Sequence, residues 1–154
     1  MITETQVQTL LHIKEVAKNL MRFAAELLAR AQVHDESKLS EPELSMFDKF
    51  TGQLKETTYG SEEYWEMLAG LGPALQHHYE NNSHHPEHYE GGVAGMNLFD
   101  LVEMYCDWEA AVKRHNDGDM YKSIEHNATR FGMDAQLVSI FHNTRRLNEG
   151  KQNE

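Results

Sequence analysis

The sequence predicts an all-α protein, and three observations lead to this class. Its 154 residues suffice for one domain with a hydrophobic core but are too few to expect two. Ala, Leu, Met, Glu and Lys together far outnumber the β-branched residues that fill strands. Several segments repeat apolar residues at intervals of three and four. We therefore expect one helical-bundle domain of about five to seven helices over residues 1–147, followed by a frayed tail, 148–154.

The first helix is predicted over residues 4–31, which contain nothing that breaks a helix. His12 falls on the same side of this helix as Val16, Phe23 and Leu27 at 3.6 residues per turn. We therefore expect its imidazole to face the core, where it needs a polar partner.

The middle of the chain is predicted to hold two helices and a loop. Ser40 precedes an early acid and a proline, which is typical of a helix start, so the second helix should cover residues 42–54. A third should run over 61–79 with an interruption at Gly72-Pro73. Residues 80–95 have the Asn, Ser, Pro and Gly content of a loop.

Three more helices are predicted in the remaining third. Asn97 is placed to cap a helix over 98–113, with Asp100 three residues later in the capping-box position. Helices over 117–132 and 134–147, each begun by an aspartate, complete the expected fold.

Charge and cysteine content restrict the partners and the compartment. The formal net charge is -11, and no run of Lys or Arg forms a basic patch, so long nucleic acid is not an expected partner. A small anion remains compatible, because a bound divalent metal can dominate the local field. The lone Cys106 excludes an intramolecular disulfide and suits a reducing compartment, and no apolar run approaches ~20 residues. We expect a cytoplasmic protein without a membrane partner; a homodimer is compatible with the sequence.

Histidines are concentrated in one segment. The chain has ten, and five of them fall within twelve positions: His77, His78, His84, His85 and His88. Neutral imidazole together with carboxylate suits Mn, Fe, Co, Ni or Zn, whereas an oxygen-only site would favour Ca or Mg. A polar loop that happens to be histidine-rich is the alternative. We expect at least one of the five to bind metal or phosphate.

Acids interrupt the apolar helix predicted over 98–113. Asp100, Glu103 and Asp107 are spaced by three and four residues and so form one stripe. Because an unpaired buried carboxylate is costly, this stripe must meet solvent, a basic partner or a metal. A solvated face with an N-terminal cap explains Asp100 and Glu103, whereas Asp107, deeper in the helix, is predicted to be a metal ligand.

The order of these residues resembles the HD-domain metal-dependent phosphohydrolase superfamily. A histidine in a long first helix, His12, precedes the pair His34-Asp35, then further histidines, and finally Asp107 in a late helix. The resemblance covers about residues 8–115 of the printed sequence. It implies that these four residues hold a divalent metal.

The resemblance also assigns roles to other residues. Some members of the superfamily hold a second metal with two further histidines, and here His78 and either His84 or His85 occupy that interval. HDESK matches the HDxxK extension, so Lys38 resembles a phosphate-contacting lysine, although small 5'-nucleotidases have glutamate there. The middle histidines are also crowded into one loop rather than spread over two helices. Separately, HHPEH and DLVEMYCDWEAA are similar to a family of short, functionally uncharacterised phage and bacterial proteins.

The function implied is hydrolysis of a small phosphorylated molecule, and a nucleotide is the substrate class that we expect first. One or two ions of Mn, Co, Fe, Ni or Zn, with Mg allowed in a second site, would activate water. Lys38 would hold a phosphate oxygen and Glu103 would orient the water. His84, His85 or His88 would bind the second metal or protonate the leaving oxygen. Two alternatives stay open: a di-iron oxygenase with the same ligands, and a non-enzymatic acidic factor that binds a protein partner.

Overall fold

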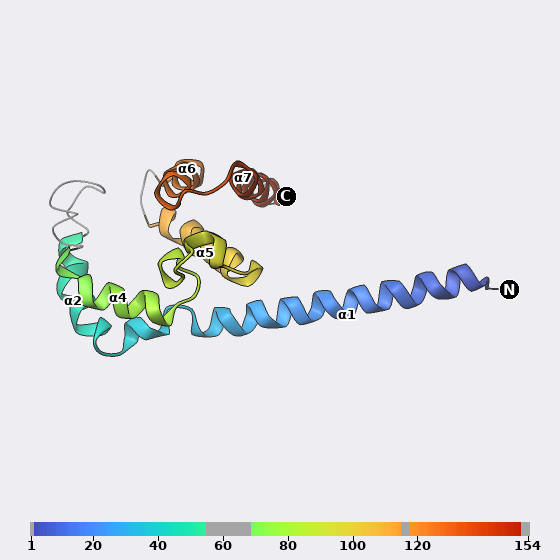
Figure 1. Ribbon diagram of the computed structural model, residues 1–154, viewed down its shortest axis with the longest axis horizontal. Coiled ribbons are helices and arrows are strands. Elements are labelled where there is room, and N and C mark those ends of the chain that lie inside the picture. Colours follow the sequence, from blue (N-terminus) through green and yellow to red (C-terminus); the bar gives the residue numbers. More distant parts are fainter. Residues whose placement is uncertain (1, 55–68, 115–117, 152–154) are drawn as a thin grey trace. The chain divides into compact units, whose positions relative to one another are not determined.

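The computed structural model describes residues 2–54, 69–114 and 118–151. Within these residues it contains six α-helices and no strand, which confirms the all-α prediction (Figure 1). The chain divides into two compact units, Met1–His34 and Asp35–Glu154. None of the described helices combines the length and the apolar character that crossing a membrane requires.

The N-terminal unit is the single helix α1, Glu4–Val33. Its start is a capping box: the Thr3 hydroxyl accepts from the Gln6 backbone N–H at 3.2 Å, and the Gln6 side chain accepts from the Thr3 N–H at 2.9 Å. The helix extends slightly beyond the predicted end, with His34 as its C-cap. No residue of α1 is buried, and the core-facing orientation of His12 stays a prediction.

The C-terminal unit begins with a turn and two packed helices. Asp35 has φ 58, a left-handed conformation that aspartate tolerates better than most residues. It leads into the 3₁₀-helix η1, Glu36–Leu39, then α2, Glu43–Leu54, and α4, Gly72–Asn81, which pack on one another. The predicted second helix is confirmed; of the predicted third helix, α4 is the resumed part, and residues 61–68 lie outside the described ranges.

The loop predicted over residues 80–95 begins after α4, which includes residues 80 and 81, and has two short turns of 3₁₀-helix, η2, Pro86–His88, and η3, Gly92–Gly95. It ends at α5, Leu98–Val112, whose capping box confirms the sequence prediction. The Asn97 side chain accepts from the Asp100 N–H at 3.2 Å, and the Asp100 carboxylate accepts from the Asn97 N–H at 2.9 Å. This cap fixes where the loop ends.

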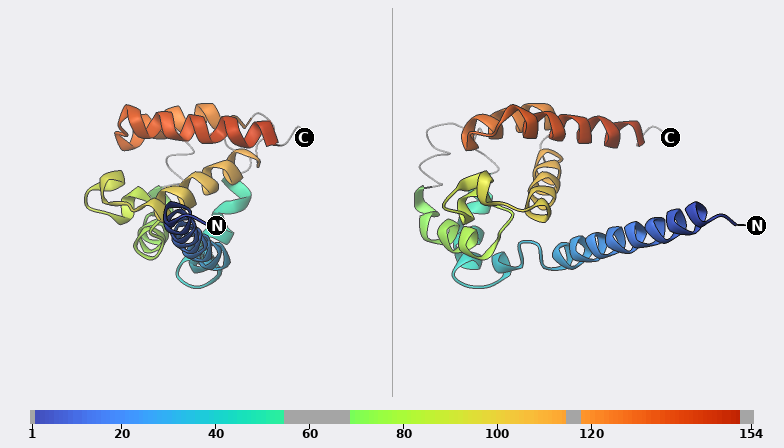
Figure 2. Two further views of the ribbon diagram at one scale, coloured as in Figure 1. Left: turned by 90° about the vertical axis from the view of Figure 1, so that its right-hand side faces the viewer. Right: turned by 45° about the vertical axis from the view of Figure 1, so that its right-hand side comes forward.

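Helices α6, Met120–Phe131, and α7, Ala135–Lys151, lie side by side (Figure 2). Asp119 caps α6, two positions after the predicted start at residue 117, which is outside the described residues. Asp134 caps α7, as predicted. Of the predicted tail from residue 148, the structure keeps 148–151 in α7, and residues 152–154 are not described. The core joins three helices through Met104, Tyr105, Met120, Ile124 and Phe141.

Candidate metal centre

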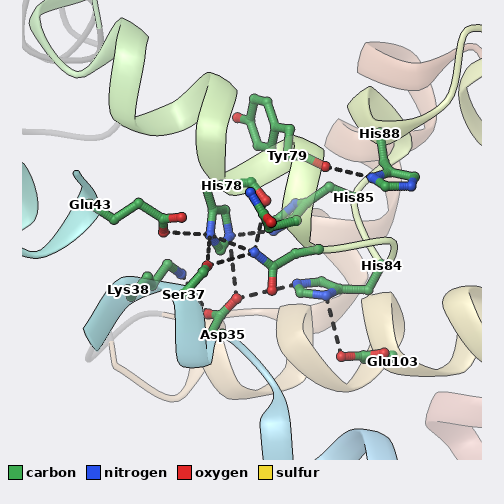
Figure 3. Close-up of polar contacts among 12 residues, drawn as sticks. Asp35, Ser37, Lys38, Glu43, His78, Tyr79, His84, His85, His88 and Glu103 are labelled. Atoms are coloured by element: carbon green, nitrogen blue, oxygen red, sulfur yellow. Dashed lines mark hydrogen bonds and ion pairs between the residues drawn. The ribbon is translucent and has the colours of Figure 1, made fainter. Parts of the chain in front are cut away.

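Four of the predicted metal ligands gather in the C-terminal unit (Figure 3): Asp35, His78, His84 and His85. Each offers one ligand atom, and these atoms all lie within 4.8 Å of one another. They come from three segments, namely the turn before η1, the last turn of α4, and the loop between α4 and η2. The packing of α4 against η1 and η2 therefore brings together residues about fifty positions apart in the printed sequence.

The spacing of these atoms fits one shared ion. His78 Nε2 lies 3.3 Å from Asp35 Oδ1, and His84 Nε2 lies 3.5 Å from the same oxygen. His78 Nε2 lies 2.9 Å from His85 Nε2. Ligand atoms bound at about 2.0–2.2 Å, with bond angles from about 90° to tetrahedral, stand roughly 2.9–3.6 Å apart. The observed separations fall within this range.

Glu43 orients His78 from the side away from Asp35. The Glu43 side chain accepts from His78 Nδ1 at 2.9 Å and from His77 Nδ1 at 2.7 Å. Glu43 and His78 are 0% and 2% exposed. Because a carboxylate on Nδ1 places the proton there, the Nε2 lone pair is left facing the cluster, as in metal sites where a carboxylate supports a histidine ligand.

The charge of Glu43 is itself stabilised by its partners. Burial raises the pKa of this carboxyl, but hydrogen bonds from His77, Ser37 and His78 outweigh burial. The pKa of Glu43 is therefore lowered, and the side chain stays ionised. Asn82 adds two hydrogen bonds beside Glu43: its side-chain amide donates to Ser37 Oγ and to the His78 carbonyl, both at 2.8 Å.

A second carboxylate supports His84 in the same way. Glu103 Oε1 lies 3.3 Å from His84 Nδ1, while His84 Nε2 faces Asp35. His84 is 2% exposed. The sequence suggested Glu103 as a residue that orients water, and the structure adds its contact with a predicted ligand. Asp107, one turn further along α5, has a carboxylate oxygen within 4.8 Å of one from Asp35.

His85 is held in its neutral form. Burial lowers its pKa most, electrostatic interaction with His84 and His78 lowers it further, and Asp107 and Asp35 oppose this, so that the pKa is about 3. Its ring lies 4.2 Å from the His84 ring and 5.1 Å from the Tyr79 ring, measured between centroids. Neutral imidazole is the form that binds metals.

Two residues predicted to be catalytic have other contacts. Lys38 Nζ lies 2.5 Å from Asp35 Oδ2, so the lysine charge is paired with a cluster residue. His88 is exposed, and its Nδ1 donates to the Tyr79 carbonyl at 2.7 Å, outside the cluster (Figure 3). Of the remaining predicted ligands, His12 is part of α1 and His34 caps it. Their participation stays a prediction.

Some of the residues that build the site were not predicted. In the sequence, Glu43 was only an early acid of a predicted helix, and no local pattern connects it with His77 and His78. Asp100 was interpreted as part of a solvated face, and this is wrong: it is 0% exposed, although its capping role is confirmed. Its carboxylate accepts from Ser83 at 2.8 Å and from Tyr89 at 2.7 Å, which joins the loop to α5.

A cavity of about 640 Å³ adjoins the cluster. His85, Asp107 and Tyr79 line it near the cluster, and Trp108, Phe131 and Arg130 belong to the rest of its wall. Small-molecule sites commonly have volumes of about 300–1,000 Å³. The cavity is therefore large enough for a small organic substrate.

Comparison with family models places the chain in a family without an assigned activity. The model of DUF5662, described as a family of unknown function, matches residues 1–147. The chain belongs to this family. Comparisons with curated proteins and with solved structures found no match.

Proposed function

We propose that this member of the DUF5662 family is a metal-dependent hydrolase of small phosphorylated molecules, with nucleotides as the first class to test. The observation that carries the proposal is the cluster of Asp35, His78, His84 and His85, whose ligand atoms have the mutual spacing of one coordination shell. Three imidazoles and a carboxylate favour Mn, Fe, Co, Ni or Zn over Ca or Mg.

The supporting carboxylates favour a metal over a purely structural histidine cluster. Glu43 and Glu103 each contact the Nδ1 of a histidine whose Nε2 faces Asp35. This arrangement directs two lone pairs at one point, where an unfilled site would leave them repelling each other and the Asp35 oxygen. Histidine ligands of metal sites have the same carboxylate support.

The adjoining cavity favours catalysis over a closed structural site. Structural metal sites are closed by protein ligands, whereas catalytic sites keep a position open for water or substrate. His85 belongs to the cluster, Asp107 has a carboxylate oxygen within 4.8 Å of one from Asp35, and both line the cavity, so a molecule in the cavity can reach the site. A bound divalent ion would supply Lewis acidity and a water of lowered pKa.

The chain's own residues would prepare this site for a phosphorylated substrate. His85 stays neutral because of burial and its histidine neighbours. Lys38 balances part of the charge of Asp35. Asp107, on the cavity wall, is placed to accept a hydrogen bond from a water molecule beside the cluster. The apolar side chains of Trp108 and Phe131 would exclude bulk water from the rest of the substrate.

The test is elemental analysis of the purified protein, followed by a screen of phosphorylated metabolites with Mn²⁺ and Co²⁺. We expect a transition metal in the wild type and its loss in His84→Ala. His88→Ala is the matched control, because it removes a histidine of the same loop that is outside the cluster. A wild type that holds no metal and gains no thermal stability from Mn, Co, Ni or Fe would contradict the proposal.

A further inference from the structure

We propose that Arg130 is the anion-binding residue of the cavity and that it contacts an oxyanion of the substrate, the role that the sequence suggested for Lys38. This inference rests on the proposed function, because it takes the substrate to be phosphorylated. It concerns recognition of the substrate and not the metal ligands, so the two can be tested separately.

Lys38 is poorly placed for this role because it is not among the described residues that line the cavity, and because its partner, Asp35, is itself a cluster residue. Its ammonium lies 2.5 Å from Asp35 Oδ2 and 5.7 Å from the centroid of the Phe47 ring. Releasing it to a phosphate would leave Asp35 without this partner. A second cation is therefore needed to recognise the substrate, all the more because the chain has a formal net charge of -11 and repels anions at long range.

Arg130 has the position and the donors that this role requires. It lines the same cavity as His85 and Asp107, from helix α6. Glu87 accepts from one of its guanidinium nitrogens at 2.6 Å, and the guanidinium carbon lies 4.6 Å from the Phe131 ring centroid. The guanidinium also makes a hydrogen bond with the Tyr79 phenol. A guanidinium has five N–H donors, so these two contacts leave others for a ligand.

These contacts also hold the guanidinium in a defined orientation. Glu87 is in η2, two residues after His85, while Phe131 follows Arg130 in α6. The Arg130 side chain nevertheless remains 46% exposed. A planar guanidinium that is held by an acid and an aromatic ring and remains partly exposed matches an oxyanion better than a mobile lysine does.

Tyr79 connects Arg130 to the cluster. It lines the cavity, and its ring centroid is 5.1 Å from that of His85. The Arg130 guanidinium makes a hydrogen bond with the Tyr79 phenol. Burial raises the pKa of this phenol and Glu87 raises it further, whereas Arg130 lowers it. An oxyanion bound by Arg130 would therefore lie on the part of the cavity wall that leads to His85.

The experiment is calorimetric titration of inorganic phosphate into the Mn²⁺-loaded protein, preceded by titration of Mn²⁺ alone. In Arg130→Gln we expect the affinity for phosphate to fall about 10- to 100-fold, since a charged hydrogen bond is lost, with the affinity for Mn²⁺ unchanged. Arg146→Gln is the matched control: it makes the same substitution on α7, where Arg146 contacts only Asn143 among the partners described. Arg130→Lys keeps the charge and should give an intermediate affinity.

The outcomes separate the two proposals. The Arg130 proposal is wrong if Mn²⁺ binds but phosphate has the same affinity for Arg130→Gln as for the wild type. It is also wrong if Mn²⁺ binds and phosphate binds to neither protein. In both cases the metal site stands. If the wild type binds no Mn²⁺ but phosphate affinity still depends on Arg130, the anion site stands and the proposed hydrolase fails. Should circular dichroism show that Arg130→Gln is unfolded, Arg130→Lys decides: an intermediate phosphate affinity supports the proposal, and wild-type affinity in that variant overturns the role of the Arg130 guanidinium.

Discussion

At the residue scale, the site depends on paired histidines and carboxylates that lie far apart in the sequence. The prediction of Asp35, His78, His84 and His85 as ligands rested on residue type and on family resemblance, and the structure brings these four together. Glu43 could not be predicted, because its contact with His78 spans thirty-five positions and depends on how α2 packs against α4. The spacing of residues in the sequence predicts which side chains share a face of one helix, but not which helices pack together.

Replacing Glu43 tests whether it supports the site. Glu43→Gln keeps the shape but removes the charge that fixes the proton on His78 Nδ1, so we expect the affinity for Mn²⁺ or Zn²⁺ to fall about 10- to 100-fold. Glu41→Gln, two residues earlier, is the control, since Glu41 is exposed and accepts from Ser45. Competition titration with a chelating dye measures the metal affinity of both variants. Equal affinity in wild type and Glu43→Gln would show that Glu43 does not act on the site.

His85 predicts a pH dependence of the metal-free protein. Its pKa is about 3 in the fold against the ordinary value of 6.5, so between these values the unfolded chain binds a proton that the folded protein does not. Stability should therefore fall as the pH drops from 6.5 towards 3. In His85→Gln this contribution is absent. Urea unfolding should therefore show that the free energy of unfolding falls less between pH 7.5 and pH 4.5 in this variant than in the wild type. An equal loss in both proteins would contradict the assignment.

At the element scale, caps were predictable and the position of the loop was not. Asn97 with Asp100, and Asp134, are local signals, because a cap contacts the helix that it begins. The same Asp100 carboxylate also accepts from Ser83 and Tyr89. No spacing in the sequence showed these contacts, because they depend on the path of the loop over α5. They place Ser83, and with it the adjacent His84, against α5.

Asp100→Asn tests this anchoring of the loop. An amide cannot accept all the hydrogen bonds of the carboxylate, so we expect a loss of about 1–3 kcal/mol in the free energy of unfolding and weaker metal binding through His84. Asp134→Asn changes another helix cap in the same way, away from the cluster, and should leave the affinity for metal unchanged. Urea unfolding and metal titration measure the two effects. If the Asp100 variant loses stability but binds metal as wild type does, the loop is not what positions His84.

At the scale of the whole molecule, the all-α class followed from composition and periodicity, whereas the division after His34 did not. The predicted ligands His12 and His34 belong to the N-terminal unit, and the four that gather belong to the other. The C-terminal unit thus holds enough donors for one transition-metal ion, and the cavity beside them holds the residues proposed to recognise the substrate.

The most direct test is anomalous X-ray diffraction from crystals grown with Mn²⁺ or Co²⁺. The central claim predicts an anomalous peak about 2.0–2.3 Å from the Nε2 atoms of His78, His84 and His85 and from Asp35 Oδ1. The same map would show whether Asp107, His34 or His12 completes the coordination. A fully loaded crystal with no peak among these four side chains, or with its peak elsewhere, would contradict the account.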